Sequence, residues 1–207
     1  HDDVTTTDEL IPSGETSSYR SNPLRLSEFA LSRREPQYVP RAKAVAAEEA
    51  KRREDNSSQE VINILSKVCA NPEDTAKKTQ FGSCVFAKRP GDGSAREQAA
   101  SCQKVLGGFA NICYEFATKR YRSNCINWGI LPFTLDKETK FDYCDGDYVY
   151  VPGIREAIKN GKEEIPAKVI TKDGTEDNTL YVKGLTEDEK KIILEGCLMN
   201  YYKAQNK

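Results

Sequence analysis

The stretch that decides the fold runs Ser83-Cys-Val-Phe-Ala87, then Lys88-Arg-Pro-Gly-Asp-Gly93, then Ser94-Ala-Arg-Glu-Gln-Ala-Ala-Ser-Cys-Gln-Lys-Val-Leu106. The first segment is a short apolar run typical of a buried strand, and the second is rich in turn residues. In the third, Ser94 and Glu97 have the spacing of a capping box, which predicts a helix that ends at Gly107-Gly108. Phe109–Phe116 is again apolar and predicts a second buried strand. This order of elements indicates an α/β domain.

The sequence that follows predicts further mixed structure. Residues 117–128 predict a short helix closed by Gly129, and residues 130–135 are again apolar. Beyond them come an apolar run at 148–151, a short helix near 154–159, and a hairpin in which Asp173-Gly174 joins 167–171 to 179–182. Thr186 and Glu189 should cap one last helix, on which Ile193, Cys197 and Tyr201 share a face. We therefore expect a mixed sheet with flanking helices and a C-terminal hairpin plus helix.

The N-terminal part looks less regular. Residues 1–39 predict an irregular lead-in, and Pro40 begins a solvated helix through Glu54 with Glu48/Arg52 and Glu49/Arg53 pairs. Ser57 and Glu60 form a second capping-box pattern, before an apolar helix stripe that should pack on the core: Val61, Ile64, Leu65 and Val68. We expect one domain over 1–207, with a lead-in and solvated helix over 1–56 and the core over 57–207.

Composition excludes several classes of protein. The 207 residues carry a net charge of −1, which argues against a polybasic nucleic-acid arm, and the run Ser123–Leu135 is too short to span a bilayer. The only histidine is His1, which excludes a buried histidine relay or a multi-histidine metal site. Seven cysteines without a Cys-x-x-Cys pair indicate buried thiols in a reducing compartment, and we expect the cytoplasm. The only methionine is Met199, so we expect a fragment of a longer chain.

The loop before the predicted helix 94–106 is the strongest candidate for chemistry. Its glycines would let the backbone approach a ligand, and the helix would aim free N–H groups at an anion. Ser94 stands at that helix start, and Arg96 can form bidentate bonds to a carboxylate or phosphate. A serine there could act as a base without histidine, although an ordinary capped helix has the same pattern.

A second candidate lies in the lead-in. Asp8 and Arg20 flank a Ser/Gly-rich loop, and an acid with an arginine in such a loop suits carboxylate binding. Taken alone, the pattern is weak, and a solvated loop is its more common explanation.

Together these stretches resemble one family. Thr6-Thr-Asp8 with Arg20, Gly91-x-Gly-Ser-x-Arg-Glu97 and Asn127-x-Gly-Ile-Leu-Pro-Phe133 occur in the order found in the C-terminal swivel domain of the aconitase family. The resemblance runs from residue 4 to about residue 135. It implies a swivelling β/β/α domain of a hydro-lyase that dehydrates and rehydrates a small hydroxy-di- or tricarboxylic acid.

The resemblance also implies roles for single residues. Ser94 would be the catalytic base, Arg96 and Arg20 would hold substrate carboxylates, and Asp8 would be an acid near the site. Ala95 stands where aconitase has a second serine, so it would offer substrate only its backbone N–H. Glu9 and Gln98 replace family histidines, which favours a divergent hydratase over aconitase itself.

The implied cofactor and partners lie outside this chain. In the family a [4Fe–4S] cluster acts as the Lewis acid and is ligated by other domains, so we expect no metal on this chain and no activity from it alone. The implied partners are the cluster-bearing domains and the hydroxy-carboxylate substrate.

Two alternative readings remain. The chain could be a separate small subunit of an isopropylmalate dehydratase-type enzyme. It could also be an RNA-binding relative, given Arg33-Arg34 and Lys51-Arg-Arg53, but interleaved glutamates and the net charge of −1 argue against nucleic acid.

Overall fold

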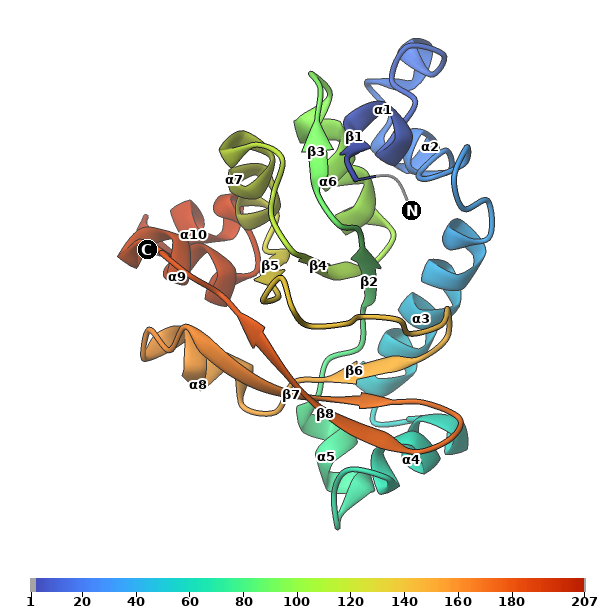
Figure 1. Cartoon of the computed structure of the whole chain (residues 1–207), viewed down its shortest axis with the longest axis vertical. Coiled ribbons are helices and arrows are strands. Elements are labelled where there is room, and N and C mark those ends of the chain that lie inside the picture. The colour runs from blue at the N-terminus through green and yellow to red at the C-terminus, as the bar shows by residue number, and fades with distance from the viewer. Residues whose placement is uncertain (1–2, 207) are drawn as a thin grey trace.

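A six-stranded mixed sheet with the order β2-β4-β5-β8-β7-β6 organises the computed structural model, which describes residues 3–206 (Figure 1). Its strands are β2 (Ser83–Phe86), β4 (Gly108–Cys113), β5 (Leu131–Thr134), β6 (Tyr148–Tyr150), β7 (Glu164–Ile170) and β8 (Thr175–Tyr181). Strands β2, β4 and β5 are mutually parallel, and the remaining pairs are antiparallel. The mixed α/β class is therefore confirmed.

The parallel half of the sheet is built from the predicted strand–helix–strand order. Helices α6 (Arg96–Val105) and α7 (Lys119–Asn127) connect its three strands and contact each other (Figure 1). Buried apolar side chains of both helices, among them Ala99, Ala100 and Cys125, form one cluster. Burial of this shared face is the main stabilising contribution in this part of the molecule.

The antiparallel half contains the predicted hairpin. Strands β7 and β8 pair from Glu164–Tyr181 to Ile170–Thr175, and the Thr171 amide donates to Gly174 O (2.8 Å) across the turn. Between β8 and β5 the described strands form one ladder pair, Thr134 with Tyr181.

A second, two-stranded sheet lies where a loop was expected. β1 (Thr5–Thr6) pairs in parallel with β3 (Pro90–Asp92), so the prediction of a turn-rich loop over 88–93 was wrong for residues 90–92. Pro90 and glycine are poor strand formers, and this strand exists because β1 supplies its partner.

The N-terminal lead-in is more ordered than expected. It contains α1 (Thr7–Leu10), the 3-10 helix η1 (Ser17–Tyr19) and α2 (Pro23–Ser27). Leu10, Ile11 and Leu26 are buried in the same cluster as Ala99 and Ala100 of α6. The core therefore draws on residues from both sides of the expected division at residue 57.

Helix α3 (Tyr38–Arg53) runs along one side of the molecule (Figure 1). It begins at Tyr38 and not at Pro40, because Tyr38 and Val39 are buried and anchor its first turn. Of the two expected pairs, Glu49–Arg53 forms, whereas Arg52 bonds Glu49 and not Glu48.

Two short helices follow α3. α4 (Gln59–Ser66) is capped by Ser58 and not by Ser57, and Val61 and Leu65 of its predicted stripe are buried. α5 (Pro72–Lys78) was not predicted, and its Ala76 packs against the same two side chains.

The C-terminal segment forms two helices after α8 (Ile154–Lys159), not one. The Thr186/Glu189 capping box opens α9 (Glu187–Glu195) as predicted, and α10 (Leu198–Gln205) follows. Gly196, with φ +90°, ends α9. A Cβ built on Gly129 would lie 1.9 Å from the carbonyl oxygen of Gly196. This close approach of two glycines breaks the single helix that the apolar spacing predicted.

Within residues 3–206, none of the helices has the length and apolar character that crossing a membrane requires.

Candidate active site

The β1–β3 pair brings the two candidate stretches together. Thr5 lies opposite Pro90 and Thr6 opposite Asp92. Because the strands are parallel, the segments that follow them start at the same end of the pair. After β1, α1 begins with Thr7 and Asp8, and after β3 the backbone continues through Gly93 and Ser94 into α6 (Figure 1). The segments that carry Asp8 and Ser94 are therefore neighbours, although they are far apart in the sequence.

Ser94 is exposed at the start of α6. The capping box expected for it does not form: the N-cap residue is Ala95, without a side-chain cap bond. Glu97, its expected partner, instead accepts a hydrogen bond from Trp128 Nε1 (3.1 Å). Within residues 3–206 the Ser94 hydroxyl has no hydrogen-bond partner, so it is available to a ligand.

Ala95 and Arg96 differ in where their side chains lie. The Ala95 methyl group is buried in the cluster that also contains Leu10 and Ala99. Arg96 is partly exposed, but its Nε is buried and has no hydrogen-bond partner among the described residues. A buried donor of a charged group is costly to leave unbonded, so this nitrogen favours an anion beside it.

Arg20 lies at the end of η1, outside the β1–β3 pair, and is exposed. The preceding residue, Tyr19, packs against the cluster that contains Ala95. Like Arg96, Arg20 forms no ion pair within residues 3–206. Both guanidinium groups are therefore open to a carboxylate from outside the chain.

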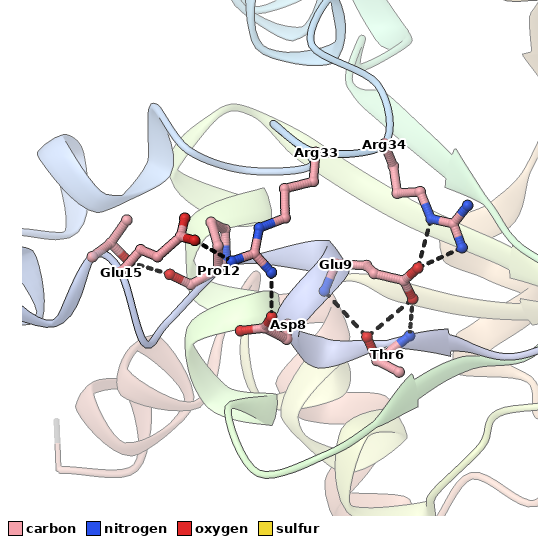
Figure 2. Close-up of polar contacts among 8 residues, drawn as sticks. Thr6, Asp8, Glu9, Pro12, Glu15, Arg33 and Arg34 are labelled. Atoms are coloured by element: carbon pink, nitrogen blue, oxygen red, sulfur yellow. Dashed lines mark hydrogen bonds and ion pairs between the residues drawn. The ribbon is translucent and has the colours of Figure 1, made fainter.

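Asp8 is exposed and bonded to an arginine that the sequence did not place in the site. Arg33 Nη1 lies 2.5 Å from Asp8 Oδ2, and Arg33 Nη2 lies 2.6 Å from Glu15 Oε1 (Figure 2). Ion pairs between residues distant in sequence leave no local pattern, so Arg33 and Glu15 could not have been found from spacing.

Glu9, which replaces a family histidine, stabilises α1. It accepts hydrogen bonds from the Thr6 backbone amide (2.7 Å) and from Arg34 Nε (2.6 Å), and Thr6 in turn caps the helix (Figure 2). Partial burial raises the pKa of Glu9, but the bonds from Thr6 and Arg34 outweigh this and hold its pKa below the usual value.

The glycines of the 91–93 loop make room for protein side chains. A Cβ on Gly91, with φ +101°, would lie 2.2 Å from the Tyr121 ring, and one on Gly93 would lie 2.3 Å from Thr7 Oγ1. These contacts, and not approach to a ligand, explain why glycine is needed at both positions.

The described part of the chain offers no set of metal ligands. It contains no group of three or more His, Cys, Asp or Glu side chains that could hold an ion. Burial raises the pKa of Cys102 and of Cys125 to about 12. The cysteines of the described residues are not grouped as the ligands of an iron–sulfur cluster would be, so they do not fit that cofactor.

Comparison with known proteins agrees with this architecture. The model of the family "Aconitase C-terminal domain" matches residues 39–138. The chain is 34% identical over 118 residues to a putative mitochondrial aconitate hydratase of Emericella nidulans, covering 56% of this chain but 15% of that protein. It is 35% identical over 133 residues to the 3-isopropylmalate dehydratase small subunit of Metallosphaera sedula, covering 64% of this chain and 72% of that one.

The fold is also similar to a solved structure. The crystal structure of a 3-isopropylmalate dehydratase from Methanocaldococcus jannaschii matches with a TM-score of 0.52 at 20% identity, over 98% of this chain and 92% of that chain. The resemblance noted in the motifs thus extends to the relatives and to the fold. With motifs, sequence relatives and architecture in agreement, the chain belongs to the aconitase C-terminal domain family.

Proposed function

We propose that this chain supplies the catalytic base and the carboxylate-binding residues of a hydro-lyase that dehydrates and rehydrates a small hydroxy-di- or tricarboxylic acid. The observation that carries the proposal is the exposed, unbonded Ser94 hydroxyl at the start of α6, beside the segment that holds Asp8. The names of the relatives, aconitate hydratase and isopropylmalate dehydratase, describe reactions of this kind.

Ser94 acts on the proton next to a substrate carboxylate. That proton is weakly acidic, because its removal leaves an electron pair that must spread onto the carboxylate oxygens. The C–H bond breaks, the proton passes to Ser94 Oγ, and the negative charge grows on the carboxylate. Arg96 and the N–H groups at the start of α6 offset this charge and favour the serine alkoxide.

The remaining residues bind and orient. Arg20 and Arg96 hold the substrate carboxylates, and Ala95 contributes its backbone N–H. Asp8, whose carboxylate is bonded to Arg33, orients polar groups near the reacting carbon or passes a proton.

In this proposal the cofactor belongs to a partner. In the family a [4Fe–4S] cluster supplies Lewis-acid chemistry at the departing hydroxyl, and the cysteines of this chain do not fit as its ligands. We therefore place the cluster on aconitase-like domains outside this sequence and expect no turnover from the chain alone. All seven cysteines are free thiols, which supports a reducing compartment such as the cytoplasm.

The test is Ser94→Ala in the whole enzyme. We expect turnover to be abolished while substrate binding changes by less than about threefold, because the alanine methyl group removes the hydroxyl and still fits beside the ligand. Ser123→Ala, at an exposed serine of α7, is the matched control and should keep full activity. Citrate, homocitrate and 3-isopropylmalate are the substrates to assay. Activity of Ser94→Ala within tenfold of the parent would remove the serine from the mechanism.

A second candidate is the separate small subunit of an isopropylmalate dehydratase-type enzyme. The lengths of the matched proteins support it, because the match spans 72% of one such small subunit and 92% of the similar solved chain. Gel filtration and denaturing electrophoresis of the native enzyme distinguish the two candidates. A chain of this size bound to a larger one supports the small subunit, and one long chain supports the domain.

RNA binding is disfavoured by the ion pairs. Arg33 bonds Asp8 and Glu15, Arg34 bonds Glu9, and the basic end of α3 bonds Glu48 and Glu49. These basic groups are neutralised within the chain. A steep fall of RNA affinity with ionic strength would be needed to revive the idea.

A further inference from the structure

We propose that Arg33 is a positioning residue that holds Asp8 and the loop carrying Arg20 in fixed relation to each other. The proposal rests on the function proposed above and adds a residue to it. Arg33 would touch no substrate, and it would act only through its two carboxylate partners.

The two partners belong to different parts of the proposed site. Asp8 is in α1, whereas Glu15 is in the loop that leads through η1 to Arg20. Arg33 Nη1 is 2.5 Å from Asp8 and Nη2 is 2.6 Å from Glu15, so one planar group joins both (Figure 2). A guanidinium can present two nitrogens to two acceptors at a fixed angle, which a lysine ammonium cannot do. Both carboxylates raise the pKa of Arg33, with the Glu15 hydrogen bond the larger cause.

An uncommon backbone turn places Arg33 there. Leu31 has φ +53°, which is disfavoured for any residue with a Cβ. Its amide donates to Leu10 O (2.9 Å), while the Arg34 and Glu35 amides donate to Leu31 O (2.9 and 2.7 Å). The turn is thus bonded directly to the end of α1, and the residues after it lie along that helix.

The neighbouring residue secures the other side of α1. Arg34 bonds Glu9, and Glu9 bonds the Thr6 amide at the start of the helix (Figure 2). Consecutive arginines therefore hold consecutive carboxylates. Arg33 also bonds Glu15 in the loop, and this contact is the one that gives it the positioning role proposed here.

The exposure of the three side chains indicates that Arg33 contributes to local order and little to overall stability. The side chains of Arg33, Asp8 and Glu15 are 43%, 53% and 70% exposed. Ion pairs this exposed add little to global stability, so their consequence is local order. Substitution of Arg33 should therefore change the loop without changing the melting temperature.

Arg41 provides a matched control. It is 40% exposed and also pairs with two carboxylates, Glu35 and Asp145, neither of which belongs to α1 or to the loop that carries Arg20. We compare Arg33→Gln with Arg41→Gln by hydrogen–deuterium exchange of this chain. Arg33→Gln should speed exchange of the amides of residues 13–22 at least about fivefold, whereas Arg41→Gln should leave them unchanged. Equal exchange in the two variants would overturn the proposal.

The second measurement uses the assembled enzyme, with citrate and 3-isopropylmalate as probes. Arg33→Gln should raise KM and lower kcat, together reducing kcat/KM by about tenfold to a hundredfold, because both Arg20 and Asp8 lose their fixed positions. Glu15→Gln should raise KM only, and Arg33→Lys should restore part of the loss. An unchanged kcat/KM in Arg33→Gln overturns the proposal. Failure of the proposed function shows separately, as activity retained by Ser94→Ala, and the exchange experiment does not depend on it.

Discussion

Thr7 Oγ1 lies where Gly93 would carry a side chain: a Cβ built on Gly93 would be 2.3 Å from that oxygen. Thr7 precedes Asp8 at the start of α1, and Gly93 precedes Ser94 at the approach to α6. Thr7 is also buried, so it has little room to move aside. The spacing between the acid and the base of the proposed site therefore depends on the absence of one methyl group.

Gly93→Ala tests this contact. Gly93 has φ +124°, so alanine adds both backbone strain and the clash with Thr7, and we expect a loss of about 2–4 kcal/mol in unfolding free energy. Gly146→Ala is the control, because Gly146 has φ +96° but nothing within 4 Å of its Cβ position, and it should cost only about 1 kcal/mol. Urea unfolding of both variants gives the comparison. Equal losses would show that the clash with Thr7 contributes nothing.

Arg96→Met should separate stability from binding. Arg96 Nε is buried without a partner in residues 3–206, so its removal should leave stability unchanged or raise it by about 1 kcal/mol. In the assembled enzyme, citrate affinity measured by calorimetry should fall about tenfold to a hundredfold, because a charge-assisted bond is lost. Arg89→Met, at an exposed arginine paired with Glu115, should change neither. Intact binding with reduced stability would assign Arg96 to the fold.

Glu49→Gln should make stability less dependent on acid. Burial raises the pKa of Glu49, but hydrogen bonds from Arg52, the Phe81 amide and Arg53 outweigh it and hold the pKa below the usual value. A lowered carboxyl pKa stabilises the fold above the pKa of the unfolded chain, and this contribution disappears as the pH falls through the folded value.

The free energy of unfolding of the wild type should therefore exceed that of Glu49→Gln by about 1.5–3 kcal/mol at pH 7, because hydrogen bonds to a charged carboxylate are lost. The difference should shrink as the pH falls below about 4.5. Glu28→Gln, which breaks an exposed pair with Lys43, should cost less than about 1 kcal/mol. Urea unfolding at several pH values measures both. A difference that stayed constant down to pH 3 would show that the Glu49 charge does not matter.

Elements with their own local signals could be predicted from sequence. Strands β2, β4 and β5 are apolar runs between glycines and turns, and the hairpin turn at Asp173-Gly174 and the cap at Thr186 need only nearby residues. Each of these signals lies in residues that are close in sequence. The strand–helix–strand order of the parallel half, and with it the mixed α/β class, could therefore be predicted from the sequence.

Contacts between distant residues decided the rest. The same Ser/Thr-x-x-Glu pattern caps α9 but not α6, because Glu97 bonds Trp128 instead of returning to Ser94. Strand β3 exists only beside β1, and Gly196 breaks the final helix where Gly129 approaches it. None of these partners can be identified from spacing.

The candidate site divides in the same way. Ser94, Arg96, Asp8 and Arg20 came from motifs and from a family resemblance, and their roles stay a prediction. The neighbouring positions of the Asp8 and Ser94 segments follow from the β1–β3 pairing. Arg33 and Glu15 were missed because surface ion pairs have no sequence signature.

The single bridge between Thr134 and Tyr181 means that backbone bonds barely join the two halves of the main sheet. Phe133 of β5 and Leu180 of β8 lie in one buried cluster, so packing of apolar side chains holds the two halves together. Leu180→Ala should then cost about 3 kcal/mol in urea unfolding and speed deuterium uptake in β5 as well as β8. If β5 kept its protection, this cluster would not be what holds the two halves together. Apolar contacts weaken in the cold, so the boundary between β5 and β8 is where the structure should first open on cooling.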